Sequence, residues 1–99
     1  MPIVVFRSRL RAGDITEFQS LAERMYGLAQ TMPGFVSYKV FVAADDERCS
    51  IIEFDTSEHL EAWRRHPEHI DAMGRGRDAF YEEYSLRVCE IVRESGFAH

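Results

Sequence analysis

The first apolar stretch of the chain, Ile3-Val4-Val5-Phe6 within residues 2–10, decides how the rest can fold. Alternate residues of this stretch point to opposite faces, one with Ile3, Val5, Arg7 and Arg9, the other with Val4, Phe6, Ser8 and Leu10. Apolar residues on both faces are typical of a central strand that is covered on two sides. We therefore predict a central strand over residues 2–10.

The clearest helix signal follows at residues 14–31. Apolar residues recur there at steps of three and four and form one stripe, made of Phe18, Leu21, Ala22, Met25, Leu28, Ala29 and Met32. Asp14 is the expected N-cap, with Glu17 three residues later at the spacing of a capping box. Pro33-Gly34 ends the helix, because proline cannot continue it and glycine accepts the turn.

Two strands with alternating apolar residues are predicted next, at residues 35–42 and 48–55. The polar turn between them, residues 44–47, is short. Strands joined by so short a turn pair as an antiparallel hairpin.

The second half of the chain carries a broken helical region and a final strand. Thr56-Ser57 are expected to cap a helix that runs through Trp63. Pro67 fits the first turn of a second helix, where its missing N–H costs nothing, and this helix is expected to reach Tyr81. The last strand is predicted at residues 84–93.

The predicted order of elements is β-α-β-β-α-β, with the second helical region broken at His66-Pro67. This is the ferredoxin-like α+β arrangement, a four-stranded antiparallel sheet with the helices on one face. The helices can cover only one face, although the first two strands carry large apolar residues on both. An uncovered apolar face normally marks an interface, so a homodimer joined sheet to sheet is predicted.

Ninety-nine residues suit a single domain, and we expect it to span residues 1–99, with a core to about residue 94 and a tail at 95–99. A net charge of −5 disfavours nucleic-acid binding and adhesion to an anionic membrane. No leader-like segment opens the chain, so a cytoplasmic location is expected. Cys49 and Cys89 fall in predicted strands and are expected to be buried free thiols.

Several short segments occur in a familiar order and spacing: Ile3-Val4-Val5-Phe6-Arg7, Met32-Pro33-Gly34-Phe35-Val36-Ser37-Tyr38, Ile52-Glu53-Phe54, Trp63, His66-Pro67-Glu68-His69, Gly76-Arg77, and Phe80-Tyr81 with Tyr84. No single segment is diagnostic. Together, over almost the whole chain apart from the tail, they resemble the antibiotic biosynthesis monooxygenase-like (ABM) family of the dimeric α+β barrel superfamily.

The resemblance implies a homodimer with a pocket in each subunit between the helices and the sheet. It also implies an oxidation, without a cofactor, of a phenolic or quinol-type aromatic compound by dioxygen. In such relatives an asparagine, a tryptophan four residues later and a tyrosine six after that act on the substrate. Trp63 matches the tryptophan here, whereas His59 stands at the asparagine position and His69 at the tyrosine position.

An enzyme of this kind needs a base that deprotonates a phenol, because the electron-rich phenolate can pass an electron to dioxygen. Histidine, with a pKa near neutrality, can take that proton. His69 is the first choice for this base, with His59 or His66 as substitutes. Trp63 would supply a flat wall for ring stacking. Three further side chains are candidate donors to a substrate oxygen: Tyr38, Tyr81 and Arg77.

Each of these residues also has an ordinary structural interpretation. Trp63, at the end of a short amphipathic helix, fits a core position equally well. His66 precedes a proline and is favoured as a helix cap over a catalytic residue. Arg77 is spaced to face inward and to pair with Glu53. A solvated helix surface fits two others as well as a cavity does, His59 and His69.

Two other functions compete with the monooxygenase. One is a non-enzymatic dimeric domain whose pocket holds an apolar small molecule. The other is haem binding or degradation, which is disfavoured because Phe6-Arg7-Ser8 lacks the asparagine of haem-degrading relatives and Met73 stands where they place a histidine. No metal site is predicted, since no third ligand joins His66 and His69.

Overall fold

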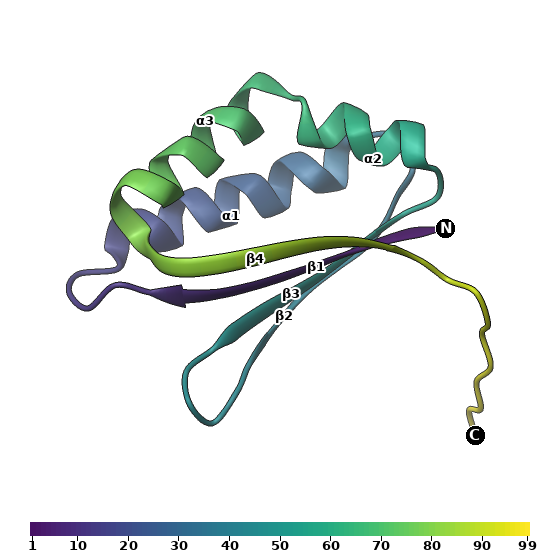
Figure 1. The fold of residues 1–99 in the computed structure, drawn as a ribbon. Helices are drawn as coiled ribbons and strands as arrows, with labels where there is room; N and C mark the ends of the chain where they lie inside the picture. Colours follow the sequence, from purple (N-terminus) through teal and green to yellow (C-terminus); the bar gives the residue numbers. More distant parts are fainter.

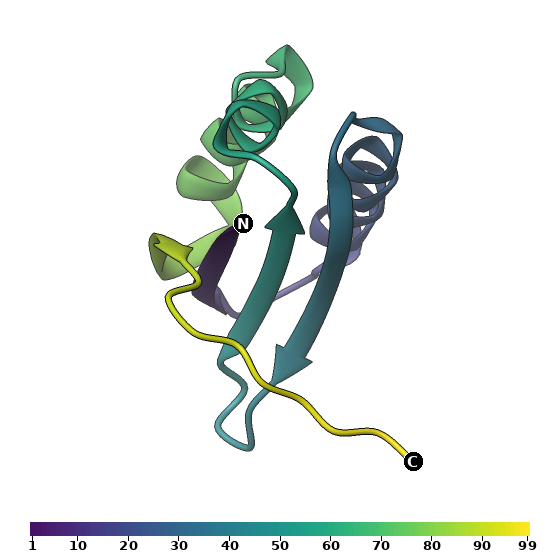
Figure 2. The same ribbon diagram turned by 90° about the vertical axis from the view of Figure 1, so that its right-hand side faces the viewer.

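The computed structural model describes residues 1–99 and confirms the predicted order of elements (Figure 1). These are β1 (Pro2–Leu10), α1 (Thr16–Thr31), β2 (Phe35–Val42), β3 (Arg48–Phe54), α2 (Ser57–Arg64), α3 (Pro67–Arg75), the π-helical turn η1 (Gly76–Phe80) and β4 (Tyr81–Glu90). The strands form one antiparallel sheet in the order β2-β3-β1-β4. All three helices lie on the same face of this sheet, as Figures 1 and 2 show. The fold is therefore the predicted ferredoxin-like α+β arrangement.

β1 occupies the centre of the sheet, as its two apolar faces predicted. Val4 pairs with Ile52 of β3, and Phe6 pairs with Leu86 of β4, so these side chains share the face under the helices. The core lies between that face and the helical layer. Its buried cluster consists of Val4, Phe6, Ala29, Ile52, Phe54, Leu60 and Trp63.

α1 buries the predicted stripe, with Phe18, Met25 and Ala29 inside. The expected cap at its start is wrong: Ile15 is the N-cap, and the Asp14 carboxylate instead accepts hydrogen bonds from the N–H and hydroxyl of Thr16, at 2.9 and 2.6 Å. The capping box does not form, because with Ile15 as the N-cap Glu17 is the second helical residue and not the third. Glu17 instead binds the Arg75 guanidinium of α3 at 2.6 and 2.8 Å.

The break between α2 and α3 follows from local capping. Thr56 is the N-cap of α2, and its hydroxyl accepts the His59 N–H at 3.1 Å. Pro67 is the first residue of α3, and the N-cap His66 accepts the Glu68 N–H through Nδ1 at 3.2 Å. Both predicted caps are confirmed, and the Nδ1 atom of His66 is used in capping α3.

The end of α3 and the last strand differ from the prediction. The α-helix ends before Gly76, and the π-helical turn η1 leads into β4 at Tyr81, three residues before the predicted start at residue 84. β4 ends at Glu90, three residues before the predicted end at residue 93. Arg11 causes the early start, because its guanidinium donates at 3.0 Å to each of the carbonyls of Arg77, Asp78 and Tyr81. These carbonyls would otherwise lack partners where the helix stops.

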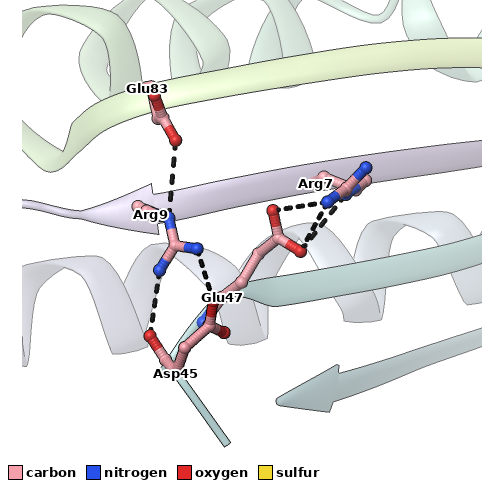
Figure 3. A network of polar contacts seen from close by, with 5 residues as sticks. All are labelled: Arg7, Arg9, Asp45, Glu47 and Glu83. Atoms are coloured by element: carbon pink, nitrogen blue, oxygen red, sulfur yellow. Dashed lines mark hydrogen bonds and ion pairs between the residues drawn. The ribbon is translucent and has the colours of Figure 1, made fainter. Parts of the chain in front are cut away.

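The sheet face opposite the helices is open in the single chain. Cross-strand register places Ile3, Val5 and Ile51 on it. Near the β2–β3 hairpin the same face carries an ion-pair network of Arg7, Arg9, Asp45, Glu47 and Glu83 (Figure 3). Cys89, which pairs with Ile3, is exposed on this face, and Cys49 is only half-buried, so the prediction that both thiols are buried is wrong.

Beyond β4 the chain extends away from the helical layer (Figure 1), with Val92 and Phe97 almost fully exposed. No helix of the structure has the length and apolar character needed to traverse a bilayer.

Candidate functional site

A cavity of about 320 Å³ lies between the helices and the sheet. Hydrophobic residues make up 16 of the 22 that line it, so the cavity suits a largely apolar molecule of small-ligand size. The other six lining residues are Ser8, Glu23, Arg48, Ser50, Arg64 and His69, and four of the hydrophobic ones also carry a polar atom: Tyr26, Tyr38, Trp63 and Tyr81.

Trp63 forms an inner wall of this cavity and belongs to the core as well. It lies one turn after Leu60 on the buried side of α2 and is only 3% exposed. Its ring stacks on Phe54 at 5.6 Å between centroids. The indole Nε1–H is buried and has no hydrogen-bond partner. An unpaired buried donor costs about 1–3 kcal/mol, so an acceptor atom on a ligand would relieve this cost.

His69 lies against Trp63, with the two ring centroids 4.3 Å apart. Its Nδ1 is 3.2 Å from the backbone carbonyl oxygen of Arg64. Because a carbonyl only accepts, Nδ1 must carry the hydrogen, which leaves the lone pair of the neutral ring on Nε2. Burial lowers the pKa of His69 below its ordinary value, and the nearby charges of Arg64 and His66 act in the same direction. His69 is therefore neutral at pH 7 and able to accept a proton.

Two phenols line the same cavity. Tyr38, on β2, packs edge-on against Trp63 with centroids 6.2 Å apart, and Tyr81, at the start of β4, packs against Phe6. Burial raises the pKa of Tyr38, and burial raises the pKa of Tyr81 to about 12. Both side chains therefore stay protonated at neutral pH and can donate hydrogen bonds to an oxygen of a ligand.

Six polar lining residues were not predicted from the sequence: Ser8, Glu23, Tyr26, Arg48, Ser50 and Arg64. Arg48 and Ser50 lie on the same face of β3 as Ile52, which packs under the helices. The alternation along β3 could have predicted the position of Arg48, because Arg48 lies on the same face of the strand as the core residues Ile52 and Phe54.

The structure does not bring the other predicted residues to the cavity. His59 does not line it; its Nδ1 is 2.7 Å from Asp55, and this hydrogen bond lowers the pKa of the Asp55 carboxyl. Arg77 is exposed and lies against the Tyr84 hydroxyl. The predicted pair of Arg77 with Glu53 does not form, because Glu53 points to the open face of the sheet and accepts from Ser37 at 2.9 Å.

The four predicted site residues that line the cavity are Trp63, His69, Tyr38 and Tyr81. No three His, Cys, Asp or Glu side chains lie close enough together to hold a metal ion. The arrangement can therefore bind a flat apolar molecule, accept a proton at His69 and donate hydrogen bonds from Trp63 and the two phenols.

Comparison with known proteins decides the family. Residues 1–75 match the family model described as antibiotic biosynthesis monooxygenase. The chain belongs to the antibiotic biosynthesis monooxygenase family. Over 94 residues, 95% of this chain and 82% of the relative, it is 33% identical to the uncharacterized protein YqjZ of Bacillus subtilis.

Solved structures agree on the fold of this ABM chain. A Deinococcus radiodurans protein described as an antibiotic biosynthesis monooxygenase has a TM-score of 0.86 over 100% of both chains, at 11% identity. SnoaB from Streptomyces nogalater, titled a cofactor-independent oxygenase, has a TM-score of 0.79 over 94% of both chains, at 16% identity. Rv0793 from Mycobacterium tuberculosis has a TM-score of 0.78 over 97% of this chain and 100% of its own, at 16% identity.

Proposed function

We propose that this protein is a cofactor-independent monooxygenase that oxidises a phenolic or quinol-type aromatic molecule with dioxygen. The observation that carries the proposal is one pair of side chains in a mostly apolar cavity. His69 is neutral, with a lone pair on Nε2, and its ring packs at a tilt against Trp63, whose N–H is unpaired. Family membership supports the same reaction class.

The reaction begins with proton transfer. The substrate ring lies against the indole of Trp63, and His69 Nε2 accepts the phenolic proton, while the Nδ1–H bond to the Arg64 carbonyl holds the ring in place. The imidazolium that forms stabilises the phenolate by charge. Trp63 Nε1–H and the phenol of Tyr38 donate to oxygen atoms of the substrate.

Oxidation then balances without a cofactor. The phenolate passes one electron to dioxygen, and the two radicals combine at a ring carbon to form a peroxide. Cleavage of its O–O bond turns this C–H ring carbon into a carbonyl carbon. One oxygen atom stays in the product, and the other leaves as water with the ring hydrogen and the proton that His69 had accepted. The substrate thus supplies all four electrons that dioxygen accepts, and His69 returns to its neutral form.

Oxygen uptake with a phenolic anthrone and a 1,4-naphthoquinol tests this proposal. The His69→Ala variant should lose most of the catalysed uptake, because it lacks the base, with general-base contributions of about 10²–10⁴-fold. His59→Ala is the matched control, since His59 lies outside the cavity, and it should keep its uptake. Unchanged uptake in His69→Ala would remove His69 as the base. No catalysed uptake by the wild type on any such substrate would remove the proposed activity.

The assembly proposed with this function is a homodimer joined through the open sheet faces. Val5 and Ile51 pair at the centre of that face, and Phe41 at its edge is 50% exposed. Apolar residues of this size in the middle of an open sheet indicate an interface. Light scattering at micromolar concentration should give twice the chain mass for the wild type and for Ile70→Lys, which changes an exposed residue of α3. Ile51→Lys should give the monomer, and a monomeric wild type would refute the dimer.

A non-enzymatic small-molecule carrier is the second candidate. It is favoured by the histidines at positions 59 and 69, which replace the asparagine and the tyrosine that the resemblance leads one to expect. A carrier would bind aromatic ligands through Trp63 and leave them unoxidised. Ligand binding by wild-type protein, detected as quenching of Trp63 fluorescence, without any oxygen uptake would favour the carrier over the oxygenase.

A further inference from the structure

Arg48 reaches the cavity from the hairpin end of the sheet. It is the first residue of β3 and pairs across the sheet with Ser8 of β1 and Val42 of β2. Its side chain is half-buried, lines the cavity and lies with its guanidinium carbon 5.2 Å from the centroid of the Phe18 ring on α1. Packing against an aromatic ring orients the guanidinium but does not neutralise its charge.

The acidic residues next to Arg48 in the sequence are paired elsewhere. Glu47 accepts three hydrogen bonds from the Arg7 guanidinium, at 2.9, 3.0 and 3.2 Å, and the Asp45 carboxylate accepts one from Arg9 at 2.7 Å. Figure 3 shows these pairs gathered in one network. Successive strand residues point to opposite faces, so Glu47 belongs to the open face and Arg48 to the cavity.

Arg48 is the one cation of the cavity that forms no ion pair. The other lining arginine, Arg64, donates to the Glu61 carboxylate at 2.8 Å. The single acid of the lining, Glu23, is exposed and forms no ion pair with Arg48. A half-buried guanidinium that forms no ion pair can bind an anionic group of a ligand.

Two serines lie beside Arg48 on the same face of the sheet. Ser8 is its cross-strand neighbour, and Ser50 lies two residues along the same face of β3. The charge of Arg48 also acts on the phenols of Tyr38 and Tyr81, where it opposes the rise of their pKa, so both rings are within electrostatic reach of it. The cavity thus has one polar end built from a single cation and several hydroxyl donors.

We propose that Arg48 forms a carboxylate-binding subsite at the hairpin end of the cavity, and that the substrate of this protein is an aromatic acid. This inference rests on the proposed function, since it specifies which phenolic compounds the same cavity takes. One guanidinium matches one carboxylate in charge and geometry through two parallel N–H···O bonds. A phosphate would call for more than the one unpaired cation that this end offers.

The subsite can be tested by binding, without turnover. The probes are 1-hydroxy-2-naphthoate and its neutral analogue 1-hydroxy-2-naphthamide, titrated against the quenching of Trp63, the only tryptophan. Wild-type protein should bind the acid about tenfold to hundredfold more tightly than the amide, the range expected for a hydrogen bond to a charged group. Equal affinity for the two probes would overturn the subsite.

Three variants test whether Arg48 causes the preference for the acid over the amide. Arg48→Met keeps the apolar stem and should bind the amide as wild type does while losing the preference for the acid. Arg48→Lys keeps the charge and should recover part of it. Arg65→Met, which changes an arginine that is 82% exposed outside the cavity, should behave as wild type. An undiminished preference in Arg48→Met would refute the role of Arg48, and circular dichroism confirms that each variant is folded.

Failure of this subsite and failure of the oxygenase give different results. A preference for the acid that depends on Arg48, without oxygen uptake on phenolic acids or neutral phenols, would refute the oxygenase and leave the subsite. Oxygen uptake with no preference between acid and amide would refute the subsite and leave the oxygenase.

Discussion

The unpaired indole N–H of Trp63 leads to an unusual prediction for the Trp63→Phe variant. Trp63 is 3% exposed and packed between Phe54 and His69, so truncation to alanine should cost about 3–5 kcal/mol, as for other buried aromatic residues. Phenylalanine keeps most of the ring contact, and it also removes the donor that has no acceptor. The two consequences of this change oppose each other.

The magnitudes decide the sign. Phenylalanine buries about 50 Å² less apolar surface than tryptophan, worth about 1.3 kcal/mol at about 25 cal/mol per Å². Removing a buried N–H without a partner regains about 1–3 kcal/mol. The free energy of unfolding of Trp63→Phe should therefore equal that of the wild type to within about 1 kcal/mol, or exceed it.

Denaturant unfolding followed by far-ultraviolet circular dichroism is the suitable assay, because the substitution removes the only tryptophan and with it the fluorescence signal. Both proteins are compared at equal concentration, since dimer formation would otherwise shift the midpoint. The same variant should bind a naphthol carrying an oxygen acceptor more weakly, because it lacks the indole donor. A stability loss above about 3 kcal/mol would show that Nε1–H has a partner in solution and would refute the reasoning.

Three further changes test other parts of the structure. Burial lowers the pKa of His69, so as the pH falls the unfolded chain binds a proton there before the folded chain does, and the free energy of unfolding should fall as the pH drops below about 6.5. His69→Ala should make the free energy of unfolding depend less on pH, as measured by urea titrations at several pH values. Gly34 has φ +82°, and a Cβ there would overlap Asp55 and His59, so Gly34→Ala should lower the unfolding free energy by more than about 1 kcal/mol; no change by calorimetry would contradict this. Thr56→Ala should lose about 1 kcal/mol with the α2 cap, whereas Thr56→Ser should keep it, and equal melting temperatures for the two would disprove the cap.

Local patterns were sufficient for most of the fold. The bounds of β1 and β2 match the prediction, because alternation along a strand depends on neighbouring residues alone. The break before Pro67 and the caps at Thr56 and His66 were equally readable, since a cap is set by residues within one turn.

The predictions failed where a distant residue acts. The start of β4 depends on Arg11, which binds carbonyls 66 to 70 positions away in the chain. The Glu17 carboxylate, expected in a capping box, binds Arg75, which is 58 positions away. Neither interaction leaves a periodic signal near the segment that it changes.

The sequence by itself determined the helices and strands that enclose the cavity, and four of the residues that it suggested line that cavity: Trp63, His69, Tyr38 and Tyr81. Only the tertiary structure distinguished His69, whose ring packs against Trp63, from His59, which forms a hydrogen bond with Asp55. It also assigned Arg48 to the cavity and left it without an acidic partner. The physical reason is that periodicity along an element fixes which residues share its face, whereas sheet register and the contacts between elements fix what each face meets.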